Sequence, residues 1–202
     1  MNNWLILAST SQRRQKLLSK IIRKFEIKRA PEPNYIVKND SASSEVKRMS
    51  EFKAVWVALR NPRFVTIGAD TIVEVNAQKL PKPKNKSCAK KFIQLINSKK
   101  IQVHTGVCIC YFDGFRSIKK SNWTTKSVLK CKKLSHEQID EYIESNLWHG
   151  KAGGFNILEK PTSNWFYFRK KDADNIAGLD VKTVKKRIKK FKVLVFPLKK
   201  NR

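Results

Sequence analysis

The stretch FVTIGADTIVEV, residues 64–75, constrains the fold of this chain more than any other segment. Its β-branched and small residues predict a buried strand, although Asp70 stands in the middle of it. Aspartate has a poor β propensity, and a buried ionised carboxylate needs a compensating partner or a shifted pKa. Two interpretations follow. Either neighbouring backbone amides donate to Asp70, or its carboxylate takes a proton or binds a cation at the floor of a cleft.

The N-terminal segment predicts a short strand, a polar turn and an amphipathic helix within residues 12–25. Ser9 or Ser11 can cap the start of this helix. Arg13 and Arg14 then fall in the first turn, where the helix macrodipole is unfavourable for cations. Beside backbone amides and serine hydroxyls, these arginines suit a bound anion such as a phosphate. Surface arginines at an ordinary helix end are the alternative interpretation.

Two lysines stand where a cation is either unusual or conformationally restricted. A helix is expected over residues 44–59, with an apolar stripe formed by Val46, Met49, Phe52, Trp56 and Leu59. Lys53 projects close to the middle of that stripe, so its ammonium must reach out to water or meet an anion. Lys82 lies between Pro81 and Pro83, which restrict the backbone and favour an extended conformation. Solvated lysines are the alternative interpretation for both.

Predicted strands and helices alternate along the chain, which favours an α/β or α+β domain with a mixed sheet. We expect one domain over residues 1–202. Asp113-Gly114 predicts a hairpin, Ser135 to Gln138 a capping box, and Ser87 a helix cap. The further elements expected are strands at 4–8, 101–112, 125–134 and 165–168, helices at 87–97, from 135 and at 181–191, and glycine-rich turns at 150–155 and 175–179.

Composition narrows the class of protein and its compartment. The formal net charge of +28 favours polyanionic partners such as nucleic acid or nucleotide phosphates, although evenly spread, solvated lysines explain it equally well. No apolar run is long enough to span a bilayer, and no export signal is recognised, so we expect no membrane partner. The four cysteines, Cys88, Cys108, Cys110 and Cys131, lack paired C-x-x-C spacing, which indicates reduced thiols in the cytoplasm and disfavours a zinc site.

With these features in place, the chain resembles the Maf family of nucleotide pyrophosphatases. The first matching segment, LILASTSQRRQKLL, is similar to the N-terminal phosphate motif of that family, and IGADTIVEV resembles its central aspartate strand. The segments that match in family order lie at residues 5–18, 67–75, 79–83, 103–107, 134–145, 150–157 and 175–179. The resemblance implies an inosine-triphosphatase-like α/β fold, in which a mixed twisted sheet forms two lobes with a cleft between them.

The same resemblance implies hydrolysis of a nucleoside triphosphate, with dTTP or UTP as candidate substrates, to the monophosphate and pyrophosphate. It makes Asp70 the general base and implies a divalent cation, Mg²⁺ or Mn²⁺, for which Asp70 and Glu32 are the candidate ligands. Substrate and phosphate contacts fall on Ser9, Arg13, Arg14, Lys53 and Lys82. Base specificity falls on Arg13, Thr71 and Leu158.

Some positions depart from the family pattern. Leu158 stands where the family has glutamine, Pro81 where it has glycine, and Gln12 where it has proline. Pro33 aligns with the acidic residue that the family places after its second strand, and Glu32 is beside it. The alternative function is therefore a catalytically degraded basic protein of the same fold that binds nucleic acid. The sequence leaves open a homodimer and a nonspecific affinity for nucleic acid that arises from the net charge.

Overall fold

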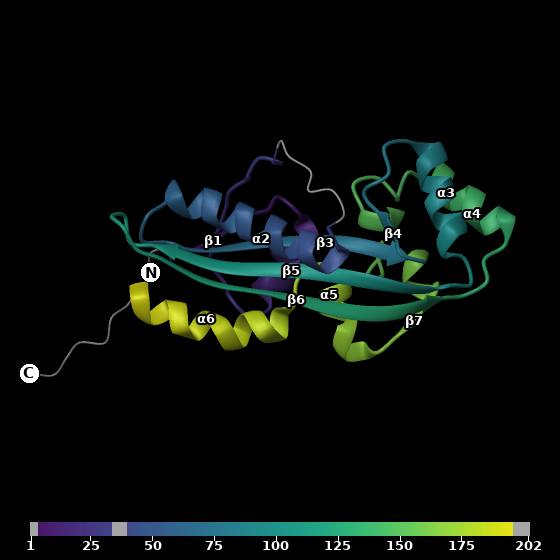
Figure 1. The fold of residues 1–202 in the computed structure, drawn as a ribbon. Coiled ribbons are helices and arrows are strands. Elements are labelled where there is room, and N and C mark those ends of the chain that lie inside the picture. The colour runs from purple at the N-terminus through teal and green to yellow at the C-terminus, as the bar shows by residue number, and fades with distance from the viewer. Residues whose placement is uncertain (1–3, 34–39, 196–202) are drawn as a thin grey trace, which may run out of the picture. The chain divides into compact units, whose positions relative to one another are not determined.

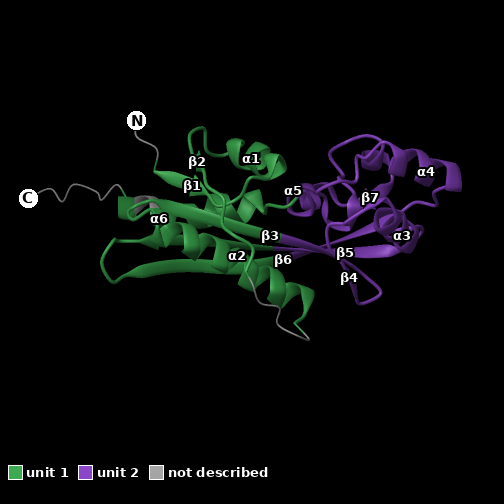
Figure 2. Cartoon of the chain, turned by 90° about the horizontal axis from the view of Figure 1, so that it is seen from above, with its two compact units in different colours: residues 1–70, 106–124, 178–202 green, residues 71–105, 125–177 purple. Residues whose placement is uncertain are grey.

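A computed structural model describes residues 4–33 and 40–195, which form two compact units (Figure 1, Figure 2). The first unit comprises residues 1–70, 106–124 and 178–202, and the second comprises residues 71–105 and 125–177. The division falls within three long strands, each of which contributes residues to both units. Two lobes were expected from the sequence, and the cleft expected between them stays a prediction.

The strands form a mixed sheet, which confirms the predicted fold class. Its order is β2-β1-β3-β5-β6-β7, with β4 paired to β3. β1 is parallel to β2 and to β3, whereas β3–β4 and β6–β7 are antiparallel pairs. The strands are β1 Leu5–Leu7, β2 Glu26–Ile27, β3 Val65–Val75, β4 Gln78–Leu80, β5 Lys100–Phe112, β6 Ile118–Cys131 and β7 Phe166–Phe168.

The predicted helices are present in the predicted order, with changes at their ends, and the short helix α5 was not predicted. They are α1 Gln12–Ser19, α2 Ala42–Leu59, α3 Lys86–Ile96, α4 His136–Glu144, α5 Ala173–Ile176 and α6 Val181–Val195, with 3-10 turns at Ala152–Gly154, Thr162–Asn164 and Lys170–Asp172. The prediction that the first helix continues to residue 25 is wrong, because α1 ends at Ser19. Within the described residues, none of the helices has the length and apolar character needed to cross a membrane.

In the first unit, α2 and α6 contact opposite faces of β6. Asn122 donates to the carbonyl of Lys47 in α2 at 3.1 Å, whereas Arg187 of α6 donates to Ser121 Oγ at 3.0 Å. Successive residues of a strand point to opposite faces, so these two contacts place the helices on different sides. The predicted apolar face of α6 is confirmed, since Val181, Val184, Ile188 and Phe191 are all buried.

Two glycines bring α2 close to the strands. A Cβ atom at Gly68 of β3 would lie 2.2 Å from the carbonyl oxygen of Ser50, and one at Gly106 of β5 would lie 2.1 Å from that of Val46. Neither position can hold a side chain without displacing the helix backbone. The α2 helix therefore packs directly on the strand backbones at these glycines.

This close packing changes which face of α2 is buried. The expected core stripe is wrong in part: Val46 is buried, but Met49, Phe52 and Trp56 keep part of their surface, and Leu59 is 45% exposed. The buried face instead consists of Ala42, Val46, Ser50, Lys53, Ala54, Val57 and Ala58. Small side chains are favoured there because the helix lies against glycine.

The second unit has its own apolar core. It is formed by residues of β3 to β7 and helices α3 to α5, with Tyr142 and Trp165 in edge-to-face contact at 4.8 Å between ring centroids. The predicted capping box of Ser135 and Gln138 is confirmed. The predicted cap at Ser87 is wrong, because Asn85 is the N-cap of α3 and accepts the amide of Cys88.

Candidate active site

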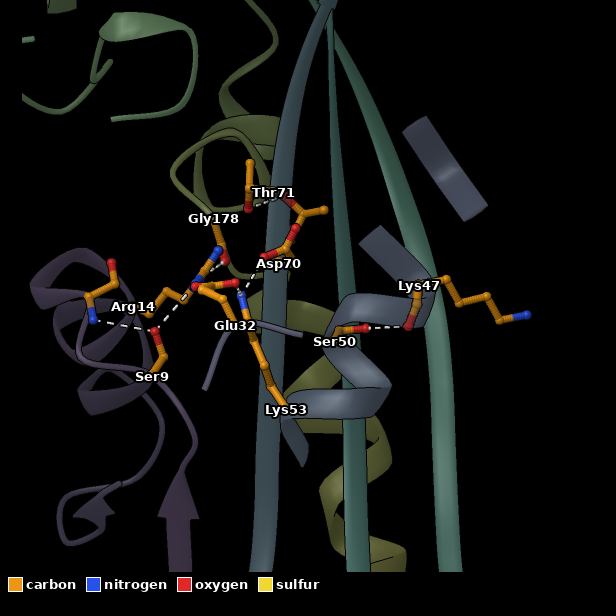
Figure 3. A network of polar contacts seen from close by, with 11 residues as sticks. Ser9, Arg14, Glu32, Lys47, Ser50, Lys53, Asp70, Thr71 and Gly178 are labelled. Atoms are coloured by element: carbon orange, nitrogen blue, oxygen red, sulfur yellow. Dashed lines mark hydrogen bonds and ion pairs between the residues drawn. The ribbon is translucent and has the colours of Figure 1, made fainter. Parts of the chain in front are cut away.

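The carboxylate of Asp70 is paired with a lysine of α2. Lys53 Nζ lies 2.7 Å from Asp70 Oδ1, and their side chains are only 11% and 18% exposed (Figure 3). The same ammonium lies 3.6 Å from Glu32 Oε2, whose side chain is 67% exposed. Asp70 thus has a cationic side-chain partner, and its role as a base or metal ligand stays a prediction. Of the two sequence interpretations of Lys53, contact with an anion is confirmed.

The close approach at Gly68 explains how this pair forms. Gly68 and Asp70 are two residues apart in β3, so both face α2. A Cβ atom at Gly68 would also lie 2.6 Å from the backbone nitrogen of Ala54, the residue that follows Lys53. The helix backbone therefore lies close to the strand next to Asp70. From there the Lys53 side chain reaches the Asp70 carboxylate.

A second part of the first unit orients Arg14. Its Nε donates to the carbonyl of Gly178 at 2.9 Å, and its Nη1 donates to Ser9 Oγ at 3.3 Å (Figure 3). Ser9 Oγ also accepts the backbone amide of Ser11 at 3.3 Å. Ser11 is the N-cap residue of α1, but its side chain makes no capping bond, so the cap predicted for either serine is not formed as expected.

The electrostatic field around Arg14 links it to Asp70. Burial is the main cause that lowers the pKa of the Arg14 guanidinium, while the negative charge of Asp70 raises it and the positive charge of Arg13 lowers it again. Glu32 makes a smaller contribution that raises it. Arginine stays charged in proteins, so these shifts describe a cation that lacks full solvation and favours nearby anions.

The remaining predicted residues lie in the second unit or at its border. Thr71 follows Asp70 in β3, is half-buried, and its Oγ1 lies 3.1 Å from Thr105 Oγ1. Lys82 is exposed after β4, and Leu158 is 51% exposed. Their roles, like that of Arg13 in α1, stay predictions.

The residues expected to hold a cation are chemically suited to one. Across the described residues, no group of three or more His, Cys, Asp or Glu side chains could hold a metal ion. Asp70 and Glu32 both lie within ion-pair distance of one ammonium, so their oxygens share one location. Two carboxylates with substrate phosphates form the oxygen ligand set that Mg²⁺ prefers, so the donors fit the expected cation.

The sequence did not single out two features of this site. The carbonyl that orients Arg14 belongs to Gly178, which lies 164 positions further along the chain. Gly68, which lets α2 approach, stands in the segment IGADT, and a glycine inside a buried strand is itself a signal of close backbone approach.

Comparison with known proteins identifies the family of this chain. Residues 4–191 match the family described as Maf-like protein. The chain belongs to the Maf family. This Maf chain is 32% identical to the dTTP/UTP pyrophosphatase of Koribacter versatilis (strain Ellin345), over 94% of its length and 95% of that protein. It is 34% identical to the dTTP/UTP pyrophosphatase of Bacillus pumilus (strain SAFR-032), over 91% and 94% of the two chains. A solved HAM1 protein from Coxiella burnetii aligns with 94% of this Maf chain and 100% of its own, with a TM-score of 0.48 and 12% identity.

Proposed function

We propose that this Maf protein hydrolyses a nucleoside triphosphate to the monophosphate and pyrophosphate, with dTTP or UTP as the candidate substrates. The observation that carries the proposal is the partly buried pair of Lys53 and Asp70 at 2.7 Å, in a chain whose relatives are named dTTP/UTP pyrophosphatases. Because the Lys53 ammonium can turn from Asp70 to an incoming phosphate, this arrangement suits an anionic substrate.

In the proposed reaction, water attacks the α-phosphorus, and the bond from that phosphorus to the oxygen bridging to the β-phosphorus breaks. Asp70 accepts the proton that the water loses, and pyrophosphate leaves with the bridging oxygen. General base catalysis of this kind contributes roughly 10²–10⁴-fold. Arg14 and Lys53 donate to the phosphate oxygens and stabilise the charge that develops on them.

The further phosphate contacts of the proposal are Ser9, Arg13 and Lys82. Ser9 and Arg14 are already joined by a hydrogen bond, so an anion bound by Arg14 would meet the Ser9 hydroxyl as well. Asp70 and Glu32 are the proposed ligands of a Mg²⁺ or Mn²⁺ ion. When bound, such an ion would neutralise phosphate charge and lower the pKa of a water molecule.

Base preference is the part of the proposal in which this chain departs from the family pattern. We propose that Thr71 and Arg13 contact the base. Leu158, which replaces the family glutamine, offers an apolar surface in place of an amide and has half of its surface exposed. We place the reaction in the cytoplasm, which agrees with the free thiols of all four cysteines.

The relatives do not favour the alternative of a degraded nucleic-acid-binding protein, since those at 32% and 34% identity are named as pyrophosphatases.

The test of the proposed hydrolysis is a pyrophosphate-release assay with a panel of ribo- and deoxyribonucleoside triphosphates and Mg²⁺ or Mn²⁺. We expect pyrophosphate and monophosphate in equal amounts, fastest with dTTP or UTP. Release of inorganic phosphate alone, or no turnover of any member of the panel, would contradict the proposal. Sedimentation of the same preparation tests the predicted homodimer.

A further inference from the structure

A hydrogen-bonded chain of three residues in the second unit ends on Thr71. Thr71 Oγ1 and Thr105 Oγ1 are 3.1 Å apart, joining β3 to β5. Thr105 Oγ1 lies 2.9 Å from the backbone carbonyl oxygen of Asn175 in α5. Thr105 is fully buried and Asn175 is 4% exposed, whereas Thr71 keeps part of its surface exposed. The buried end of the chain is therefore fixed, whereas its outer end is partly exposed.

The direction of these hydrogen bonds follows from chemistry. A carbonyl oxygen only accepts, so the single hydroxyl proton of Thr105 goes to Asn175. Thr105 Oγ1 then has no proton for Thr71, and Thr71 must donate its own proton to Thr105. With its proton committed in this way, Thr71 Oγ1 can only accept from any additional partner.

The Asn175 side chain holds the receiving carbonyl in place. Its Nδ2 donates to Ser127 Oγ at 2.9 Å and to the carbonyl of Thr125 at 3.3 Å, both on β6. These bonds fix the short helix α5 beside the strands, so the carbonyl at the inner end of the chain does not turn away. A buried network in which each donor has an acceptor has a well-defined polarity.

We propose that Thr105 and Asn175 are positioning residues that fix the Thr71 hydroxyl as a hydrogen-bond acceptor for the substrate base. This inference rests on the proposed function, in which Thr71 contacts the base. Uracil and thymine present an N–H at N3, which an accepting hydroxyl can bind. Cytosine has an unprotonated nitrogen there, so two acceptors would face each other. The polarity of the Thr71 hydroxyl thus favours UTP and dTTP over CTP.

The test compares Thr105→Val with Thr105→Ser. Valine has nearly the shape of threonine but can neither accept from Thr71 nor donate to Asn175, whereas serine keeps both bonds. The readout is the ratio of kcat/KM for UTP to that for CTP. Because both values come from one preparation, this ratio does not depend on the fraction of folded enzyme. We expect it to fall about 10- to 100-fold in Thr105→Val and to stay at the wild-type value in Thr105→Ser.

Thr66→Val is the matched control. It makes the same change in the neighbouring strand β3, at a buried threonine whose hydroxyl has no hydrogen-bond partner among the described residues. We expect Thr66→Val to leave the UTP to CTP ratio unchanged. A Thr105→Val enzyme that keeps the wild-type ratio, or a wild-type enzyme without preference for UTP, would overturn the inference.

Dissociation constants for UTP and CTP, measured in EDTA, separate this inference from the proposed hydrolysis. Wild-type protein that releases no pyrophosphate but binds UTP more tightly than CTP would contradict the hydrolase alone. If Thr105→Val removes that difference in affinity, the positioning role stands. If Thr105→Val keeps the difference, the positioning role fails even where hydrolysis is intact.

Discussion

The central feature at the residue scale is a carboxylate held close to a cation in a partly buried position. Asp70 would be costly in a strand interior without a partner, and Lys53 supplies one at 2.7 Å. The ammonium of Lys53 compensates the charge of the Asp70 carboxylate, and the carboxylate gives the buried lysine an anionic partner. A residue that breaks a local propensity rule often marks a functional site, and both of these residues do so.

Asp70→Asn should keep the fold and lose activity. The amide is nearly isosteric with the carboxylate, but it cannot take a proton from water. We expect kcat for pyrophosphate release to fall by roughly 10²–10⁴-fold, with a circular dichroism spectrum like that of the wild type. Undiminished turnover by this variant would exclude Asp70 as the base.

Removal of the lysine should cost stability because the carboxylate remains. We expect Lys53→Met to lower the free energy of unfolding by about 1–3 kcal/mol, as measured by urea denaturation at pH 7. The double variant Lys53→Met/Asp70→Asn should recover part of this loss, because no charge is then left unpaired. A double variant less stable than Lys53→Met would show that the unpaired carboxylate is not the cause.

The cysteines should differ in their reactivity. Burial raises the pKa of the Cys110 and Cys131 thiols to about 11 and that of Cys108 further, so their thiolates are scarce at pH 8. We expect a thiol reagent at pH 8 to label the native protein only at Cys88, which is partly exposed, and to label four thiols after unfolding. Peptide mapping by mass spectrometry identifies the labelled residue. Rapid native labelling of Cys108 would contradict the structure.

At the element scale, the position of α2 depends on glycine. Gly68 and Gly106 have no side chain where the α2 backbone passes over β3 and β5. Phe52, Trp56 and Leu59 are therefore left at the edge of the helix, where they line a groove together with Arg60, whose guanidinium lies 3.8 Å from the Trp56 ring centroid. The largest apolar side chains of α2 are thus not its core.

Gly68→Ala should move the helix and disturb the site. The added Cβ atom would lie 2.2 Å from the Ser50 carbonyl oxygen, so we expect a loss of more than about 2 kcal/mol in unfolding free energy and a lower kcat. The control is Gly150→Ala, where a Cβ atom meets nothing within 4 Å and only the positive φ of 70° opposes the change. That variant should lose about 1 kcal/mol and keep its activity. Equal losses in both variants would contradict the close packing of α2.

At the scale of the whole molecule, charge is the dominant property. The net charge of +28 is spread over the chain, but the first unit also has a groove between β6 and α6 lined by Lys119, Lys120, Lys186, Arg187 and Lys190. Among the described residues that line this groove there is no carboxylate, and the Phe191 side chain is buried. The described part of this surface can contact phosphates, and it offers no exposed aromatic ring on which a base could stack.

Binding of duplex DNA should therefore be sequence-blind and should weaken steeply with salt. We expect Lys186→Glu/Lys190→Glu to reduce the affinity more than the control pair Lys130→Glu/Lys133→Glu, whose lysines are exposed on the second unit. Fluorescence anisotropy at two salt concentrations measures both effects. If the two double variants weaken binding equally, the net charge alone is responsible, and the groove has no special part.

The sequence by itself determined the order of the main helices and strands, the mixed α/β class, the capping box of α4 and the apolar face of α6, because these depend on local periodicity and turn chemistry. It did not predict the short elements β4 and α5. Its motifs also indicated the Maf family and marked Asp70 and Lys53. Only the tertiary structure decided that these two side chains meet, that the carbonyl of Gly178 orients Arg14, and that small residues rather than Phe52 and Trp56 form the core of α2. Such contacts depend on how closely distant backbones approach, which hydrophobic periodicity does not specify.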